Sequence, residues 1–142
     1  MLIKQLSVFV ENRAGALAEA CRVLRDNNLN ISTLSLADTQ EFGILRLLIG
    51  DYEKAANVLK QAGFVAKITD VLALTVPNRP GGMAEVLEIL NRHQLTIEYM
   101  YAFSGECNSD AILVFRFTDP QKAAELLKNE PIQIVGPERL FR

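Results

Sequence analysis

An internal repeat constrains the fold of this chain more than any other feature of its sequence. The stretch 12–31 matches the stretch 78–97, and both begin with the pattern Asn-Arg-x-Gly-x-x-Ala-Glu. After a short insertion in the second copy the match resumes, with residues 44–56 corresponding to residues 112–124. Because an insertion in a turn disturbs a fold least, the register kept on both sides of it predicts two copies of one folding unit.

The repeat divides the 142-residue chain into two predicted domains, residues 1–69 and 70–142. In each copy a strand precedes a segment with helical spacing, and two further strands, a second helix and a short closing strand follow. Asp51 and Asp119 predict where the second helices begin, because aspartate is a favoured helix N-cap. The predicted strands are residues 2–10, 30–38, 43–50 and 64–69 in the first copy, and about 72–76, 96–104, 111–118 and 132–135 in the second.

This βαββαβ order in each copy predicts the α+β class, as two tandem ferredoxin-like units. Right-handed crossovers place both helices of a unit on one face of a four-stranded antiparallel sheet. The other sheet face also carries large apolar residues, among them Phe9, Leu48 and Val114. We therefore expect these faces or the sheet edges to pack together, within the chain or in a homodimer.

Apolar periodicity predicts which residues form the core between the helices and the sheet. The helix-facing strand residues are Leu6, Val8, Val10, Leu45, Leu47 and Ile49 in the first copy, and Leu72, Leu74, Val76, Leu113, Phe115 and Phe117 in the second. The helical stripes expected to meet them are Leu17, Cys21 and Leu24, then Ala55, Leu59 and Ala62, and in the second copy Met83, Leu87 and Leu90, then Ala123, Leu126 and Leu127.

Composition and charge exclude several classes of function. The formal net charge is -2, which argues against binding nucleic acid through phosphate neutralisation. No apolar run approaches the roughly 18 residues that span a bilayer, so no membrane contact is expected. The first residues lack the apolar region of a secretory signal, and Cys21 and Cys107 lack metal-ligand spacing. A cytoplasmic protein with reduced cysteines is the simplest expectation.

The loop between the first strand and the first helix is the most informative part of the repeat. It spans residues 11–17 in the first copy and 77–83 in the second. A glycine lets the backbone approach a ligand closely, and a helix N-terminus presents unpaired N–H groups that attract a carboxylate. The Asn12 amide can accept from an ammonium group and donate to a carboxylate. The same residue types suit a plain turn, so the loop alone leaves both interpretations open.

The loop Glu-Asn-Arg-x-Gly-x-Leu, followed by Leu-Asn-Ile, resembles the ACT domain, and the resemblance covers the whole chain as two such domains. That family has the βαββαβ plan and binds amino acids or other small effectors. The chain is most similar to the serine-sensing ACT domain of bacterial phosphoglycerate dehydrogenases and to small stand-alone tandem-ACT proteins. In the serine-sensing domain, a loop Asn and an Asn that opens the second strand hold the effector between paired domains. The resemblance gives these roles to Asn12 and Asn30, and in the second copy to Asn78 and Thr96.

The two copies depart from the family pattern in different ways. Thr96 lacks the amide of Asn30, and Ala14 replaces the usual proline that the second copy keeps as Pro80. The copies therefore differ in affinity, or only one is occupied. A bidentate clamp on a carboxylate is one role open to the arginine of each loop, and plain solvation is the other. The predicted ligand-binding residues are Asn12, Arg13, Ala14, Gly15, Ala16, Leu17, Asn30 and Ile31 in the first copy, and Asn78, Arg79, Pro80, Gly81, Gly82, Met83 and Thr96 in the second.

The resemblance implies a non-catalytic regulatory protein that binds an amino acid or similar small carboxylate and acts on a metabolic enzyme encoded elsewhere. No catalytic residue, metal site or cofactor is expected, since the sequence has no recognisable nucleophile with its base. A small ferredoxin-like enzyme and a purely structural interaction module stay open, as does an RNA binder that stacks bases on Tyr99 and Tyr101. The similarity suggests serine, and branched-chain, aromatic and histidine effectors are alternatives.

Overall fold

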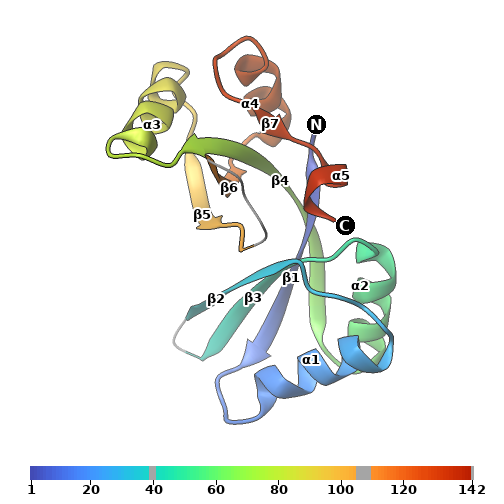
Figure 1. Ribbon diagram of the computed structural model, residues 1–142. Helices are drawn as coiled ribbons and strands as arrows, with labels where there is room; N and C mark the ends of the chain where they lie inside the picture. The colour runs from blue at the N-terminus through green and yellow to red at the C-terminus, as the bar shows by residue number, and fades with distance from the viewer. Residues whose placement is uncertain (39–40, 105–109, 142) are drawn as a thin grey trace. The chain divides into compact units, whose positions relative to one another are not determined.

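The computed structural model describes residues 1–38, 41–104 and 110–141 (Figure 1). The predicted turn that contains Cys107 lies outside these residues. The chain forms two compact units, an N-terminal unit of Lys4–Thr69 with Phe141 and a C-terminal unit of Asp70–Leu140 with Met1–Ile3. The elements in chain order are β1 (Ile3–Glu11), α1 (Ala16–Asp26), β2 (Thr33–Asp38), β3 (Phe42–Leu48), α2 (Tyr52–Gln61), β4 (Val65–Pro77), α3 (Gly82–Arg92), β5 (Ile97–Ala102), β6 (Asp110–Phe117), α4 (Pro120–Leu127), β7 (Ile134–Val135) and α5 (Pro137–Leu140).

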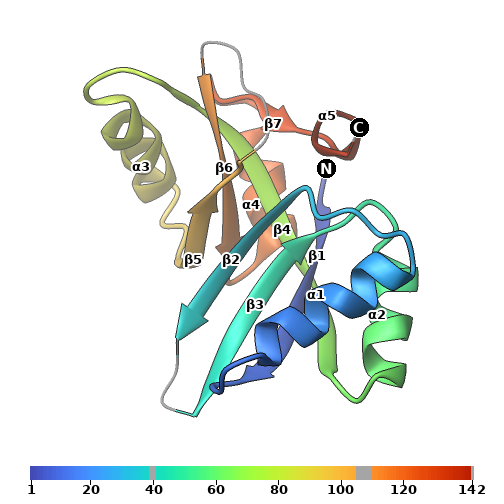
Figure 2. The ribbon, with the colours of Figure 1, turned by 60° about the horizontal axis from the view of Figure 1, so that its bottom comes forward.

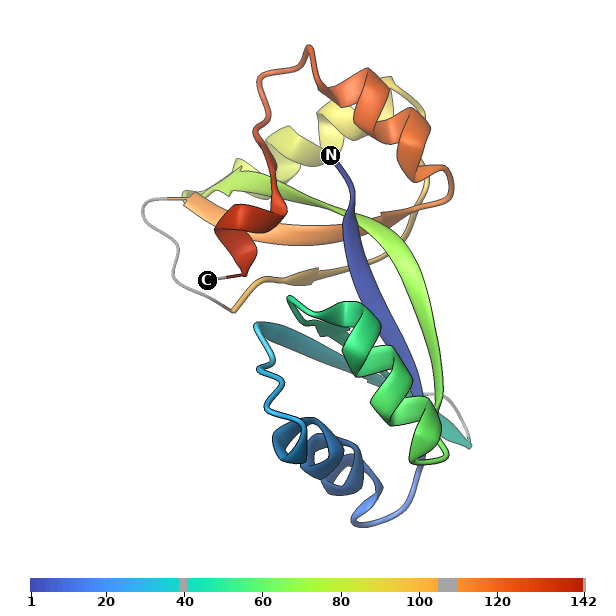
Figure 3. The same ribbon diagram turned by 90° about the vertical axis from the view of Figure 1, so that its right-hand side faces the viewer.

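Each unit has a four-stranded antiparallel sheet with two helices on one face. The strand order is β2-β3-β1-β4 in the N-terminal unit, where α1 and α2 lie on the same side of the strands (Figure 3). In the C-terminal unit the order is β7-β4-β6-β5. The predicted α+β class, with tandem ferredoxin-like units, is confirmed.

The strand β4 contributes to both units, which differs from the two separate strands predicted here. The two strands predicted at 64–69 and about 72–76 form one strand of 13 residues. No glycine or proline interrupts the sequence between Val65 and Val76, and β-branched residues such as Ile68, Thr69 and Val71 favour extended backbone throughout. The seven strands of the described residues therefore form two four-stranded sheets, because β4 belongs to both.

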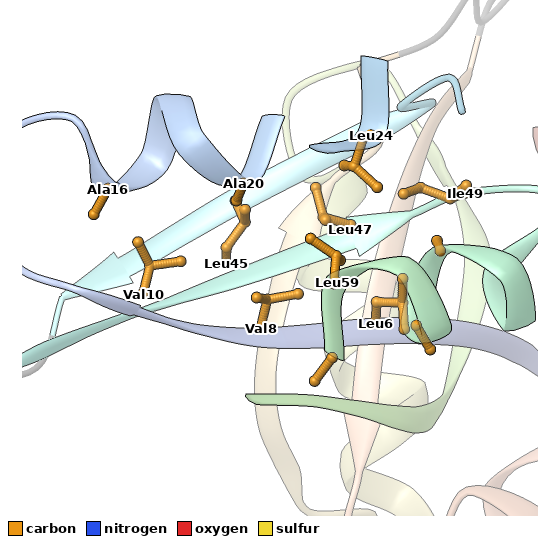
Figure 4. Packing of buried hydrophobic residues seen from close by; sticks show 13 residues of the cluster. Leu6, Val8, Val10, Ala16, Ala20, Leu24, Leu45, Leu47, Ile49 and Leu59 are labelled. Carbon is orange, nitrogen blue, oxygen red and sulfur yellow. The ribbon is translucent and has the colours of Figure 1, made fainter. Parts of the chain in front are cut away.

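The core of the N-terminal unit lies between its helices and sheet. Figure 4 shows side chains from β1 and β3, including Leu6, Val8 and Leu47, meeting Leu24 and Leu59 from the helices. The helix-facing strand residues predicted for this unit are all buried there, as Leu72, Leu74, Val76, Phe115 and Phe117 are in the C-terminal unit. Leu113 is only partly buried against that second core.

The predicted helical stripes were correct for Ala55 and Leu59 of α2 and for Ala123 and Leu127 of α4, and they were partly wrong in α1 and α3. The most buried residues of α1 are Ala16, Ala20 and Leu24, whereas Leu17 and Cys21 are only partly buried. In α3 the buried residues are Gly82, Val86 and Leu90, and Leu87 is exposed. Ala62 lies beyond the end of α2 and is exposed, whereas Ala56 within the helix is buried. Small residues such as Ala16, Ala20 and Gly82 allow a helix to approach its sheet most closely.

The connection from α1 to β2 also differs from the prediction. The strand expected from residue 30 begins at Thr33, so Asn30 and Ile31 lie in the connection and do not open the strand. The backbone N–H of Ser32 donates to the Leu48 carbonyl oxygen at 2.9 Å, immediately before the ladder between β2 and β3 starts. Figure 2 shows β2, β3 and β1 side by side, with α1 in front of β1.

The sheet face opposite the helices carries the apolar residues that the sequence predicts there. Leu48 and Val114 are fully buried, and Phe9 is half-buried. No helix within the described residues is long and apolar enough to cross a membrane.

Candidate ligand-binding loops

The loops that lead into α1 and α3 have the same backbone geometry. In the first, the N–H of Arg13 donates to the Glu11 carbonyl at 2.9 Å, and in the second the N–H of Arg79 donates to the Pro77 carbonyl at 3.0 Å. A second pair of bonds closes each turn, from Ala16 to Arg13 at 3.3 Å and from Gly82 to Arg79 at 2.9 Å. The repeat in sequence is therefore a repeat in local structure.

A left-handed glycine precedes each of these helices. Gly15 has φ 86° and Gly81 has φ 84°, a conformation that costs residues with a Cβ about 1–2 kcal/mol. The predicted role of glycine in these loops thus has a backbone reason that is independent of any ligand. Neither residue has an atom within 4 Å of the position its Cβ would occupy, so the space above each glycine is open.

The helix N-termini fall into two kinds. Asp51 caps α2 by accepting from the N–H of Lys54 at 3.2 Å, and Asp119 caps α4 by accepting from the N–H of Lys122 at the same distance. Among the described residues, no side chain caps α1 or α3. The unpaired N–H groups in the first turns of these two helices are left for solvent or a ligand.

The loop arginines are engaged in ion pairs. Arg13 donates to the Glu11 carboxylate at 2.9 Å and to the Glu19 carboxylate at 3.0 Å. These hydrogen bonds, with the negative charges of both glutamates, raise the pKa of the exposed Arg13 guanidinium. Arg79 binds both carboxylate oxygens of Glu85, at 2.9 and 2.7 Å. Each arginine therefore anchors its loop to the first helical turn, a role that differs from the predicted clamp and from plain solvation.

A cavity of about 220 Å³ lies beside Asn12 in the N-terminal unit. Sequence reasoning missed three of its residues, Leu36, Asp38 and Gly43, because the register of the sheet brings them to the loop. Gly43 pairs with Val10 across β1 and β3, and with Asp38 across β2 and β3. The full lining consists of Val10, Glu11, Asn12, Arg13, Leu17, Leu36, Asp38 and Gly43.

Asn30 and Ile31 line a different cavity, of about 390 Å³, together with Cys21 and Leu29 among others. Asn12 precedes α1 and Asn30 follows it, and a helix of 11 residues is about 16 Å long. Within the unit the structure therefore does not bring the two predicted asparagines together. Both are exposed.

The remaining predicted residues divide between surface and core. Ala14, Gly15, Asn78, Pro80, Gly81 and Thr96 are exposed, Leu17 and Met83 are partly buried, and Ala16 and Gly82 are buried. The Ala16 side chain belongs to the hydrophobic core, although it also borders a third cavity on the other side of the loop, lined by Phe9, Phe42 and Phe64. Ala16 and Gly82 therefore mainly set the distance between helix and sheet.

The described residues offer no metal site at the loops. In the described part of the chain, no three residues among His, Cys, Asp and Glu are placed to hold a metal ion. The only histidine, His93, is the C-cap of α3, and its Nε2 lies 2.8 Å from a Glu130 carboxylate oxygen. This contact ties the end of α3 to the segment after α4.

The fold and the paired loops define a tandem ferredoxin-like protein with an equivalent open helix N-terminus in each unit. The chain matches the ACT domain pair family over residues 1–142 and belongs to it. The family is homologous to regulatory ACT domains that bind amino acids.

Solved structures agree with this assignment. A protein from Bacteroides thetaiotaomicron shares 40% sequence identity and superposes with a TM-score of 0.90, over 99% of this chain and 96% of that one. The ligand-free regulatory subunit of aspartate kinase from Thermus thermophilus has 13% identity and a TM-score of 0.65, over 89% and 90% of the two chains. The corresponding subunit from Thermus flavus has 13% identity and a TM-score of 0.61, over 89% and 88%. At 13% identity these two matches show the fold alone. No curated protein matches the chain.

Proposed function

We propose that this protein is a non-catalytic regulator that binds an amino acid, or a similar small carboxylate, at the loop before α1. The observation that carries the proposal is the contrast between helix N-termini. Aspartate side chains cap α2 and α4, whereas α1 and α3, which follow the paired loops, have no such cap among the described residues. Membership in the ACT domain pair family supports the same conclusion, because homologous domains bind amino acids.

Asn12 is the proposed polar anchor of the site. It is exposed beside the cavity, and its side chain forms no hydrogen bond with any described residue, so its amide can serve a ligand. A carboxylate at the N-terminus of α1 would meet the unpaired N–H groups and the positive end of the helix dipole. Asn78 has the equivalent place before α3 and is the anchor of a second, weaker site.

The proposed site is completed by a second copy of the chain. Asn12 and Asn30 lie at opposite ends of α1, so a single unit cannot use both for one small molecule. In a homodimer, Asn12 of one protomer and Asn30 of its partner would hold the effector together. Binding across such an interface couples occupancy to the arrangement of the domains, and a cytoplasmic metabolic enzyme would sense that arrangement.

Isothermal titration of the protein against each of the twenty amino acids tests this function. At least one is expected to bind, and Asn12→Ala should weaken that binding by about 1–3 kcal/mol, the cost of an unmet polar contact. Asn30→Ala should have a similar effect, and Thr96→Ala a smaller one.

Asn57→Ala is the matched control, because Asn57 is exposed on α2, away from the loops. It should leave the affinity unchanged. The proposal is wrong if none of the amino acids binds. If Thr96→Ala weakens binding more than Asn30→Ala, the C-terminal unit holds the better site.

A further inference from the structure

We propose that the amino acid bound beside Asn12 has a large apolar side chain, which occupies the cavity between α1 and β2. This inference rests on the proposed function and specifies the ligand class of the same site. Four of the residues that line the cavity are without polar side-chain atoms, namely Val10, Leu17, Leu36 and Gly43. The four others, Glu11, Asn12, Arg13 and Asp38, carry polar groups.

The apolar residues that line the cavity extend from the core of the N-terminal unit to the edge strand of its sheet. Val10 is buried and Leu17 packs against the same core. Leu36 pairs with the core residue Leu45, so its side chain lies on the helix-facing side of the edge strand β2, yet it is 54% exposed. An apolar ligand group in the cavity would remove this exposed surface from water, which is favourable at about 25 cal/mol per Å².

The volume of the cavity suits a large side chain better than a small one. At about 220 Å³ it exceeds the roughly 150 Å³ of an apolar cavity that holds benzene. The side chain of leucine or phenylalanine would fill much of this space. The single hydroxymethyl group of serine would leave the apolar walls uncovered and would bring a polar group against them.

The polar residues suit the part that all amino acids share. The guanidinium of Arg13 already binds Glu11 and Glu19, so it is not the free cation that a second carboxylate in the ligand would need. Asp38 adds a carboxylate at the same cavity, which suits the ligand ammonium group. A neutral, apolar side chain is therefore favoured over an acidic one.

The C-terminal unit has a different lining at the equivalent positions. The repeat places Ala102 where the first copy has Leu36, and Ala111 where it has Gly43. A Cβ built on Gly43 would lie 3.1 Å from Leu36 Cδ1, so the glycine leaves room for the leucine in its present position. In the first copy, Gly43 therefore provides the space that Leu36 occupies. The second copy has alanine at both positions and lacks a leucine on this side of the cavity.

Titration of the full chain with leucine, phenylalanine and serine tests the inference, since the three share the same carboxylate and ammonium groups. Leucine or phenylalanine should bind at least about tenfold more tightly than serine, the discrimination that a few apolar carbons provide. Leu36→Ala should reduce the affinity for the preferred ligand about fivefold or more, and should change serine binding less than about twofold.

Ile68→Ala is the matched control. Ile68 is 44% exposed on β4, at the opposite edge of the same sheet, so the substitution removes similar apolar surface without reaching the cavity. Ile68→Ala should leave the affinities for leucine, phenylalanine and serine unchanged. Because Leu36 is half exposed, its variant should fold, which circular dichroism can verify.

The outcomes distinguish failure of this inference from failure of the proposed function. If serine binds as tightly as the two apolar amino acids, the inference fails and the proposed function stands. If Leu36→Ala weakens serine and the apolar ligand equally, the inference also fails, because the leucine then contributes no selectivity. If no amino acid binds, the proposed function fails and the inference fails with it.

Discussion

At the scale of single residues, the equivalent positions Ala16 and Gly82 show how two copies of one loop can need different side chains. Both begin a helix and both are buried. Ala16 packs into the core of its unit, whereas a Cβ built on Gly82 would overlap the carbonyl oxygen of Pro77. The first copy has Glu11 where the second has Pro77. The glycine is therefore required by the local backbone of the second loop alone.

Gly82→Ala should lower the free energy of unfolding by about 1–3 kcal/mol, because the backbone must shift to accept the methyl group. Denaturation with urea measures this change. Gly50→Ala is the control, since the built Cβ there lies 3.6 Å from Phe141 Cβ, an ordinary contact. Equal, small effects of the two substitutions would contradict the assigned role of Gly82.

At the scale of secondary structure, α1, α2 and α3 end in the same way. The residue after each C-cap is left-handed, with φ 57° at Asn28, 95° at Gly63 and 54° at Gln94. The next N–H then donates back to the last turn, as from Leu95 to the Leu90 carbonyl at 3.1 Å in α3. This is the Schellman motif, in which glycine is the favoured left-handed residue. Only α2 has glycine at that place among these three helices.

Gln94→Gly should raise the free energy of unfolding by about 0.5–1 kcal/mol, because glycine adopts the left-handed conformation without the cost of a Cβ. Gly63→Gln reverses the change in α2 and should lower the stability by a similar amount. Thermal unfolding of the two variants measures both. If the shifts have the same sign, the conformation of these residues does not determine their effect.

At the scale of the whole molecule, each unit has its own core but only about 65–75 residues, a size at which domains are marginally stable alone. The edge strand β2 of the N-terminal unit also exposes apolar surface. Leu34 is 47% exposed although it pairs with the core residue Leu47, so the apolar layer extends past the helices to the sheet edge. Long apolar edges are sites of association between chains.

We therefore expect a homodimer in solution, with a mass about twice 15.8 kDa in sedimentation experiments. Leu34→Lys should shift the protein towards the monomer, because it places a charge on the exposed edge. Val65→Lys, at a more exposed position on β4, should leave the dimer intact. A wild-type protein that sediments as a monomer would contradict this expectation and the proposed site between protomers.

Several features were predictable because they are properties of local sequence. The repeat and the alternation of apolar residues are sufficient to predict two βαββαβ units and most helix-facing strand residues, since side chains alternate strictly along a strand. The capping aspartates Asp51 and Asp119 predicted the starts of α2 and α4, because an N-cap interaction involves residues only a few positions apart. The paired loops were found in the same way, from the repeated Asn-Arg-x-Gly pattern.

Other features depended on tertiary structure. The helical stripe passes through Ala16 and Ala20 because the distance between helix and sheet decides which side chains fit. Leu36, Asp38 and Gly43 join Asn12 at one cavity only through the pairing of β1, β3 and β2, which no local pattern specifies. The sequence by itself therefore determined the repeated units and the loops, because these follow from residues close along the chain. Tertiary structure alone decided the lining of the cavity, because strand register brings distant residues together.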